Sequence, residues 1–282
     1  MDILGYLSCS WLTPALYLLL LVFLTLSAQA LAQSPFFIGL VRISIFFILI
    51  IHGIQLHESV FTAQGFVFGF AQDLSLIAWA GLAFYWFQSW FLPIVSLRWM
   101  ALIFAMVCSA LPGLFPGTLL SPAAVSDPWF KGHFIVATLS VGLLSLAAMH
   151  AMLMSIQDRA LHRQLSIRPN GFLAHWLEDL PPLLTMENLL FSLLYVGFAL
   201  LSLTVFSGLF FSQTLFGRPL VFDHKTVFAL LSWFLFGGLL AARWRVGLRG
   251  RAAVRWVLSA YSALLLAYVG SRFVLEVILH KV

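Results

Sequence analysis

Long apolar stretches separated by short polar or proline-containing breaks run along almost the whole chain. A helix needs about 20 mostly apolar residues to cross the hydrocarbon core of a bilayer. Stretches of that length recur from one end of the sequence to the other, and proline or glycine marks several of the breaks. They predict an all-α, polytopic integral membrane protein with about eight transmembrane helices. The predicted spans are Trp11–Leu31, Phe37–Leu56, Phe66–Trp86, Leu92–Leu111, His133–Met154, Leu189–Phe211, Lys225–Arg243 and Trp256–Ile278.

The longest polar interval lies between the fifth and sixth predicted spans, over residues 155–187. The apolar pair Trp176-Leu177 lies there near Arg159, Arg163 and Arg168, a pattern that suits a short amphipathic helix on the membrane surface. No interval is long enough for a separate soluble domain. We therefore expect one transmembrane domain over residues 1–282, with residues 155–187 as a cytoplasmic connecting segment.

Basic residues are distributed unequally between the two sides of the predicted spans. Ten of the 15 lysines and arginines fall on one side, and the positive-inside rule makes that side cytoplasmic. Both chain termini are then expected outside. The ten inner residues are Arg42, Arg98, Arg159, Arg163, Arg168, Arg243, Arg245, Arg249, Arg251 and Arg255, and the five outer ones are Lys131, Arg218, Lys225, Arg272 and Lys281.

The composition excludes several other classes of protein. Charged residues make up 9% and hydrophobic residues 62% of the 282 positions, whereas soluble domains carry about 25% charged residues. A soluble fold and a disordered chain are both incompatible with these values. The net charge of +5 fits membrane orientation, and no nucleic-acid partner is expected. Cys9 and Cys108 lie in apolar surroundings without a metal-binding spacing, so they are predicted to be buried hydrophobes.

Five of the eight histidines fall on the predicted outer side. Ionisable groups at membrane depth usually face the bundle interior or a cavity. A neutral imidazole is a good ligand for haem iron and other transition metals, so two histidines from different helices would suit haem. The alternative for each is an interfacial or hydrogen-bonded residue. The five are His52 within the second span, His57 in the loop beyond it, His133 at the start of the fifth span, His224 at the entrance of the seventh and His280 beyond the eighth.

Asp73 lies inside the third predicted span, about two helical turns from its outer end. An intramembrane carboxylate is a functional candidate because its burial is unfavourable. It is compatible with three roles: orienting a histidine ligand through the second ring N–H, forming a proton or cation site, or hydrogen bonding within the bundle. Glu58, beside His57, is interpreted as a solvated loop charge.

Three classes of function fit these residues. In the first, imidazoles bind haem near the outer leaflet. In the second, Asp73, Glu58 and the outer histidines form the path of a cation or proton transporter or of a transport accessory protein. In the third, the protein is a structural partner of another membrane complex, and the arginines between Arg243 and Arg255 bind anionic lipid or that partner. No nucleophile triad or phosphate loop stands in a credible context, so an enzyme is not expected.

The last third of the chain carries more specific motifs. They are the Asp223-x-Lys225 pair, Trp233, the run GLRGRA at residues 247–252, and Tyr268-x-Gly270. In order and approximate spacing these resemble the cytochrome c assembly family, which includes the CcsA, CcmC and HemX-like membrane proteins, and in particular its YpjD-type branch of bacterial inner-membrane proteins.

The resemblance implies that haem is handled at the outer membrane face, with apocytochrome c or other cytochrome assembly proteins as partners. His133 resembles the outer histidine that precedes the family's tryptophan-rich segment, and His280 resembles the one that follows it, with its spacing from Gly270 off by about one residue. His52 resembles a buried early histidine. Haem is thus the expected cofactor, with His52 and His133 as the expected iron ligands and His224, His280 and Asp73 as further binding residues.

The chain departs from the family pattern at three places. The tryptophan-rich signature is absent before Asp223, Ala241 aligns with a second intramembrane histidine, and His224 stands where the family usually has proline. These departures weaken the expectation of haem delivery and leave that of haem binding.

Overall fold

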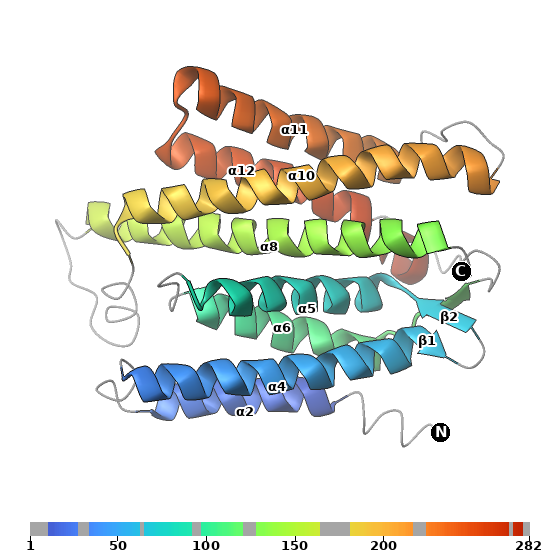
Figure 1. The fold of residues 1–282 in the computed structure, drawn as a ribbon, viewed down its shortest axis with the longest axis horizontal. Coiled ribbons are helices and arrows are strands. Elements are labelled where there is room, and N and C mark those ends of the chain that lie inside the picture. The colour runs from blue at the N-terminus through green and yellow to red at the C-terminus, as the bar shows by residue number, and fades with distance from the viewer. Residues whose placement is uncertain are drawn as a thin grey trace.

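The computed structural model describes residues 11–27, 34–62, 65–91, 97–120, 128–163, 181–216, 224–270 and 273–278. In this part of the chain eight α-helices run lengthwise beside one another (Figure 1). The all-α, polytopic fold class predicted from the sequence is confirmed. The helices are α2 (Leu12–Leu26), α4 (Pro35–Val60), α5 (Phe70–Gln88), α6 (Leu97–Leu114), α8 (Pro128–Arg163), α10 (Leu183–Phe216), α11 (His224–Val246) and α12 (Gly250–Leu265), which is followed by the π-helical turns η1 (Leu266–Gly270) and η2 (Val274–Ile278).

Six of these helical segments are long and apolar enough to cross a membrane. They are α4, α6, α8, α10, α11, and α12 together with η1. Helix α2 is apolar but has only 15 residues, and α5 carries the polar pair Gln72 and Asp73 in its first turn. All eight predicted spans therefore correspond to helices, although their ends differ from those expected.

Consecutive helices alternate in direction (Figure 1). The start of α2 and the end of η2 lie at the same end of the bundle. This agrees with an even number of membrane-crossing helices. The loops and helix ends that carry most of the arginines lie at the opposite end, which we call the inner end because the positive-inside rule makes it cytoplasmic. The other end is called the outer end. Arg168, Arg218, Arg272 and Lys281 lie outside the described residues.

Local signals explain where two of the helices begin. The Ser34 hydroxyl accepts a hydrogen bond of 3.2 Å from the backbone N–H of Phe37, so Ser34 caps α4 and Pro35 occupies its first turn. Pro128 similarly opens α8, five residues before the predicted start at His133. Helix α8 continues to Arg163 and so takes in the beginning of the expected connecting segment. An amphipathic helix was predicted within residues 155–187; α8 takes in residues 155–163, α10 begins at Leu183, and residues 164–180 lie outside the described residues.

A small antiparallel sheet covers the outer end of α4, α5 and α6 (Figure 1). Strand β1 (Phe61–Thr62) pairs with β2 (Gly65–Phe68), and β2 pairs with β3 (Thr118–Leu120). A helix was expected to start at Phe66, and that expectation was wrong because residues 66–68 pair with residues 118–120. Short apolar runs do not distinguish strand from helix by periodicity, and here a distant segment supplies the hydrogen bonds.

Helix α8 forms the centre of the bundle. It packs against α10, α5, α12 and α6. Within an apolar stretch of 18 residues in this helix, 78% is buried inside the protein. His150 on α8 donates from Nε2 to the carbonyl oxygen of Met186, at 2.9 Å, and thereby joins α8 to the first turns of α10. The contact with α5 is closest at two glycines, since a Cβ at Gly81 would lie 3.1 Å from the carbonyl oxygen of Gly142. Small residues allow such close helix packing in membranes.

We predict that Gly142→Ala destabilises the bundle. The added Cβ would lie 2.7 Å from the Cβ of Ala80 and 3.0 Å from the backbone nitrogen of Gly81, so α5 and α8 must separate. The expected loss is about 1–3 kcal/mol, typical of overpacking. Thermal unfolding in detergent measures it. Gly132→Ala is the matched control on α8 because nothing lies within 4 Å of its added Cβ, and equal unfolding midpoints for the two variants would contradict the prediction.

Candidate functional site

His52 lies in the interior of the bundle and hydrogen bonds through both ring nitrogens. Its side chain is 1% exposed. Nδ1 is 3.0 Å from the hydroxyl oxygen of Tyr17 on α2, and Nε2 is 2.9 Å from the hydroxyl oxygen of Ser75 on α5. The ring therefore joins three helices. Iron ligation by His52 stays a prediction, and it would require one of these two hydrogen bonds to be replaced.

Asp73 occupies the first turn of α5, where it is 6% exposed. It lies close enough to Tyr268, in η1, for the two side chains to interact electrostatically. The ring of Tyr268 in turn lies 5.4 Å from the Nζ atom of Lys225, at the start of α11. Asp73, Tyr268 and Lys225 thus lie one after another in space at the outer end of the bundle. They come from α5, η1 and α11.

His133 extends this set toward α10. Its Nδ1 atom is 2.8 Å from the hydroxyl oxygen of Ser207, and its ring interacts electrostatically with Lys225. The Ser207 hydroxyl donates its own proton to the carbonyl oxygen of Thr204, at 3.1 Å. In the arrangement in which Ser207 donates to Thr204, Ser207 accepts from His133, and the neutral imidazole then carries its proton on Nδ1 and its lone pair on Nε2. We call Asp73, Tyr268, Lys225 and His133 the outer polar row.

Glycine at position 208 leaves space beside His133. A Cβ there would lie 3.4 Å from the Cε1 atom of His133, so even alanine would touch the ring. His224 precedes Lys225 and is exposed at the first residue of α11. His280, the other predicted outer ligand, lies outside the described residues. The structure thus brings His133 and Asp73 into one row and places His52 in a separate set of hydrogen bonds with Tyr17 and Ser75.

Within the part of the chain that the structure describes, no three His, Cys, Asp or Glu side chains gather as a metal site. A site for a bare metal ion held by several protein ligands is therefore not found among these residues. Haem needs fewer protein ligands than a bare metal ion, because the porphyrin supplies four iron ligands and the protein adds one or two axial side chains. His133, which hydrogen bonds Ser207, is a described residue that could supply one axial imidazole.

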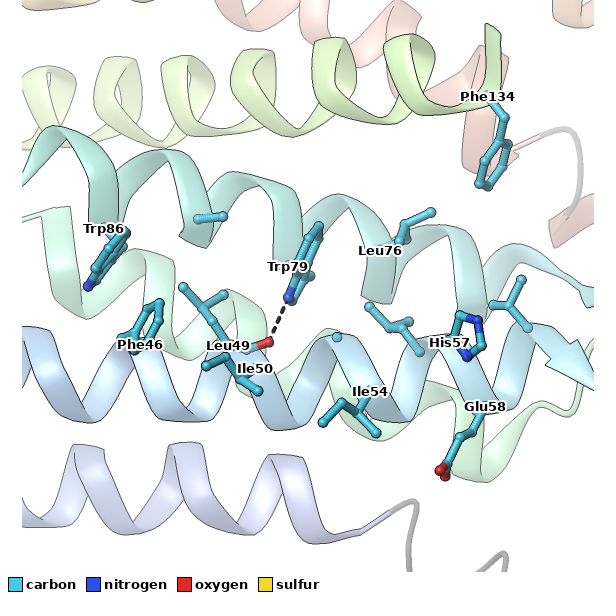
Figure 2. A pocket seen from close by; sticks show the side chains of 14 residues that line it. Phe46, Leu49, Ile50, Ile54, His57, Glu58, Leu76, Trp79, Trp86 and Phe134 are labelled. Carbon is cyan, nitrogen blue, oxygen red and sulfur yellow. Dashed lines mark hydrogen bonds between the residues drawn. The ribbon is translucent and has the colours of Figure 1, made fainter. Parts of the chain in front are cut away.

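A groove of about 660 Å³ runs between α4 and α5 (Figure 2). Its walls are almost entirely apolar and include Phe46, Trp79 and Trp86. The indole N–H of Trp79 donates to the carbonyl oxygen of Leu49, at 2.9 Å, so the polar atom of this side chain is satisfied within the wall. His57 and Phe134 close the outer end of what we call the α4–α5 groove.

His57 is the residue of this region that sequence reasoning misplaced. We expected it, with Glu58, in a loop beyond the second span, but α4 continues to Val60 and both side chains line the groove. The helix is longer because Leu56, Ser59 and Val60 are buried against the rest of the protein. Their spacing of three to four residues is the signal that would have extended the helix.

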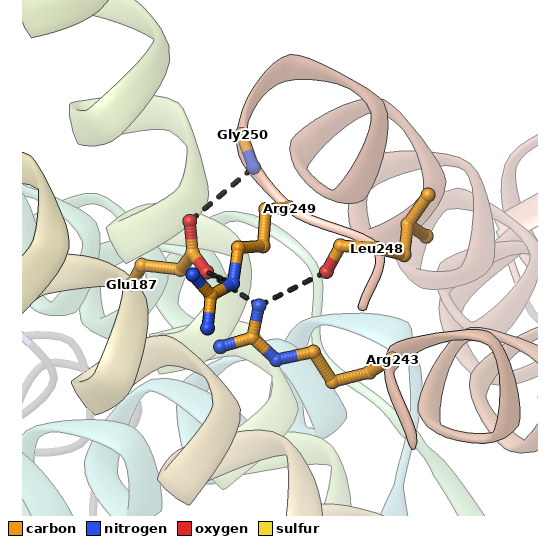
Figure 3. A network of polar contacts seen from close by, with 5 residues as sticks. All are labelled: Glu187, Arg243, Leu248, Arg249 and Gly250. Atoms are coloured by element: carbon orange, nitrogen blue, oxygen red, sulfur yellow. Dashed lines mark hydrogen bonds and ion pairs between the residues drawn. The ribbon is translucent and has the colours of Figure 1, made fainter. Parts of the chain in front are cut away.

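At the inner end, a single carboxylate organises the connection between α11 and α12 (Figure 3). Glu187 on α10 accepts a hydrogen bond of 2.6 Å from Nη1 of Arg243 and one of 3.3 Å from the backbone N–H of Gly250. Arg249 forms a longer ion pair with it, at 3.5 Å, and Arg243 also donates to the carbonyl oxygen of Leu248, at 3.1 Å. We call this set the Glu187 clamp.

The clamp explains the GLRGRA motif at residues 247–252. Gly247 and Gly250 have φ angles of 65° and 60°, in the left-handed region that glycine adopts without strain. Between them the backbone turns back so that Gly250 N–H points at Glu187. The motif therefore shapes a turn and fastens it to α10, a role that the sequence pattern did not disclose.

We predict that Glu187→Gln destabilises the protein more than Asp158→Asn. Arg243 is only 14% exposed, and the change leaves its charge without a carboxylate, at an expected loss of about 2–4 kcal/mol. Asp158 pairs with Arg251, which is 60% exposed, so its change should lose at most about 1 kcal/mol. Thermal unfolding of both variants tests the difference. An Asp158→Asn variant as unstable as Glu187→Gln would show that burial of Arg243 is unimportant.

Comparison with known proteins places these features in a family. The chain is 36% identical over 151 residues to an uncharacterised 28.8 kDa protein of Azospirillum brasilense, an alignment that covers 54% of this chain and 53% of that protein. It is 28% identical over 176 residues to the inner membrane protein YpjD of Escherichia coli K12, with 62% of each chain covered. It is 26% identical over 92 residues to the cytochrome c biogenesis protein CcsA of Gloeobacter violaceus, with 33% of this chain and 27% of that protein covered.

The alignments thus span about half to two thirds of the first two relatives. No solved structure matches the chain. The family model described as "Cytochrome C assembly protein", however, matches residues 10–279, which is nearly the whole chain. This protein therefore belongs to the cytochrome c assembly family.

Proposed function

We propose that this protein is a multi-pass protein of the bacterial inner membrane that binds haem at the outer end of its helix bundle, with His133 as an axial ligand of the iron. One observation carries the proposal: His133 Nδ1 lies 2.8 Å from the Ser207 hydroxyl, which can pass its own proton to Thr204, and this arrangement suits an imidazole that binds iron through Nε2. Membership of the cytochrome c assembly family and the similarity to an inner membrane protein and to CcsA proteins support it.

The hydrogen bond to Ser207 is the arrangement that a metal-binding imidazole needs. Histidines that bind metals usually donate the other ring N–H to a protein acceptor, which fixes the ring orientation and raises its basicity. His133 is half-buried near the outer end of α8, so its ring is held by protein and still accessible from the membrane surface. Gly208 keeps the space beside the ring open.

Other members of the outer polar row suit the remaining parts of a haem. Lys225 supplies a positive charge for a propionate, and its exposed side chain can reach the water interface. Tyr268 provides an aromatic face beside Lys225. A second axial imidazole would come from His224, next to Lys225, or from His280. Such a role is binding rather than bond-making, and apocytochrome c or another cytochrome assembly protein is the partner that it implies.

A cation or proton path is the second candidate. The observation that favours it is the set of buried polar side chains at membrane depth, namely Tyr17, His52 and Ser75, with Gln72 and Asp73 beside them on α5. Among the described residues, neither polar atom of the Gln72 amide has a hydrogen-bond partner, although the residue is 0% exposed. A chain of such groups can relay protons.

Haem titration of the purified full chain in neutral detergent tests the first proposal. We expect ferric haem to give a low-spin Soret band, and His133→Ala to weaken binding by about 100-fold as an axial ligand is lost. Ser207→Ala should weaken binding by about tenfold, because the ring loses its orienting partner. Exogenous imidazole should restore the Soret band of His133→Gly.

His57→Ala and Ser202→Ala are the controls, since His57 lies in the α4–α5 groove and Ser202 lies on α10 away from His133. Loss of the Soret band in His57→Ala with full binding by His133→Ala would place haem in the groove and refute ligation by His133. A protein that takes up no haem but carries protons into liposomes, with the flux abolished by His52→Ala, would favour the second candidate.

A further inference from the structure

A polar cavity of about 510 Å³ lies at the inner end, between α8, α10 and α12. It is separate from the outer polar row and from the α4–α5 groove. Arg159, Arg251 and Arg255 line it together with the carboxylates Asp158 and Glu187. The set thus holds three positive and two negative side chains in one cavity.

Both carboxylates of this cavity are already paired. Asp158 accepts from Nε of Arg251, and Glu187 holds Arg243, Arg249 and the N–H of Gly250 in the Glu187 clamp. Arg159 and Arg255 form no ion pair in the part of the chain that the structure describes. Arg159 and Arg255, on different helices, therefore line one cavity, and no ion pair among the described residues neutralises either charge. The N-terminus of α12 at Gly250 adds partial positive charge to the same wall.

The remaining wall is mostly apolar and reaches the protein surface. Leu184, on the first turn of α10, is 61% exposed, and Met154, Leu183 and Val254 lie beside it in the cavity lining. A ligand for this cavity must combine a compact anion with hydrocarbon. Basic pockets between helices on the cytoplasmic side have that character when they hold lipid headgroups. Arginine suits a phosphate because its planar guanidinium donates two parallel hydrogen bonds.

We propose that this cavity binds the phosphate of an anionic phospholipid of the inner leaflet, through Arg159 and Arg255, with an acyl chain along Leu184. This lipid would bind at the inner end, and its binding does not depend on the haem proposed for the outer end. It also gives the cytoplasmic arginines two different tasks, since Arg243 and Arg249 hold the turn together and Arg159 and Arg255 bind lipid.

Lipid titration of the delipidated full chain tests the proposal by native mass spectrometry. Short-chain phosphatidylglycerol should bind at least about tenfold more tightly than phosphatidylcholine of the same chain length. The double variant Arg159→Gln/Arg255→Gln should bind phosphatidylglycerol about 30-fold more weakly, and each single variant about fivefold more weakly, at about 1 kcal/mol for each basic residue. Both arginines are exposed, so unfolding midpoints and haem binding should not change.

Arg245→Gln is the matched control, because this exposed arginine lies on the same inner end outside the cavity lining. A loss of affinity in Arg245→Gln equal to that in Arg159→Gln would show general surface attraction and overturn the site. Inorganic phosphate at millimolar concentration should not displace the lipid. Full displacement by phosphate, or equal binding of the two lipids, would overturn the assignment to an anionic phospholipid.

Discussion

The close packing of α8 against α5 at Gly142 and Gly81 is the constraint on which the other features depend. Helix α8 is the most buried of the candidate spans, and its two ends carry groups of both proposed sites, His133 at the outer end and Asp158 and Arg159 at the inner end. A helix that could slide or tilt would misplace both sets together. The glycine contact resists that movement because it is made between backbones, which cannot change rotamer.

Several polar side chains inside the bundle hydrogen bond one another across helices. Tyr17, His52 and Ser75 join α2, α4 and α5, whereas Ser145 on α8 hydrogen bonds Tyr261 on α12, at 2.6 Å. Buried polar groups without partners are unfavourable in hydrocarbon, so these bonds specify which helices lie together. The Glu187 clamp also joins separate helices through polar contacts, since one carboxylate binds two arginines and the N-terminus of α12.

Much of the fold could be predicted from the sequence because the bilayer imposes a simple rule on it. Segment length and apolarity indicated the helices, and the arginines indicated the two ends of the bundle. The resemblance also indicated the family, through residues that the structure places at the outer polar row and at the turn before α12. Asp73 is buried, at 6% exposed, but it lies in the first turn of α5 and not two turns inside the helix as expected, because residues 66–68 form a strand.

What the sequence could not supply were contacts between distant positions. Ser207 is 74 residues from His133, and Glu187 is 56 residues from Arg243, so neither partner has a local signature. The strand at residues 65–68 forms because residues 118–120 lie beside it, and His57 is helical because its neighbours are buried. Each of these features depends on tertiary packing, which overrides local preference.

The π-helical turns after α12 have a consequence for how the chain tolerates change in length. A π-turn closes hydrogen bonds over five residues instead of four, so it holds one residue more than the same length of α-helix. The turn η1 contains Tyr268 and Gly270, and the resemblance described above implies a spacing from Gly270 to His280 that differs by about one residue. An inserted residue absorbed in this way leaves the helix axis in place and spares the later side chains the rotation of about 100° that an added α-helical residue would cause. Relatives with and without the extra residue would then share one backbone path and present the same face of the last helix to the outer polar row.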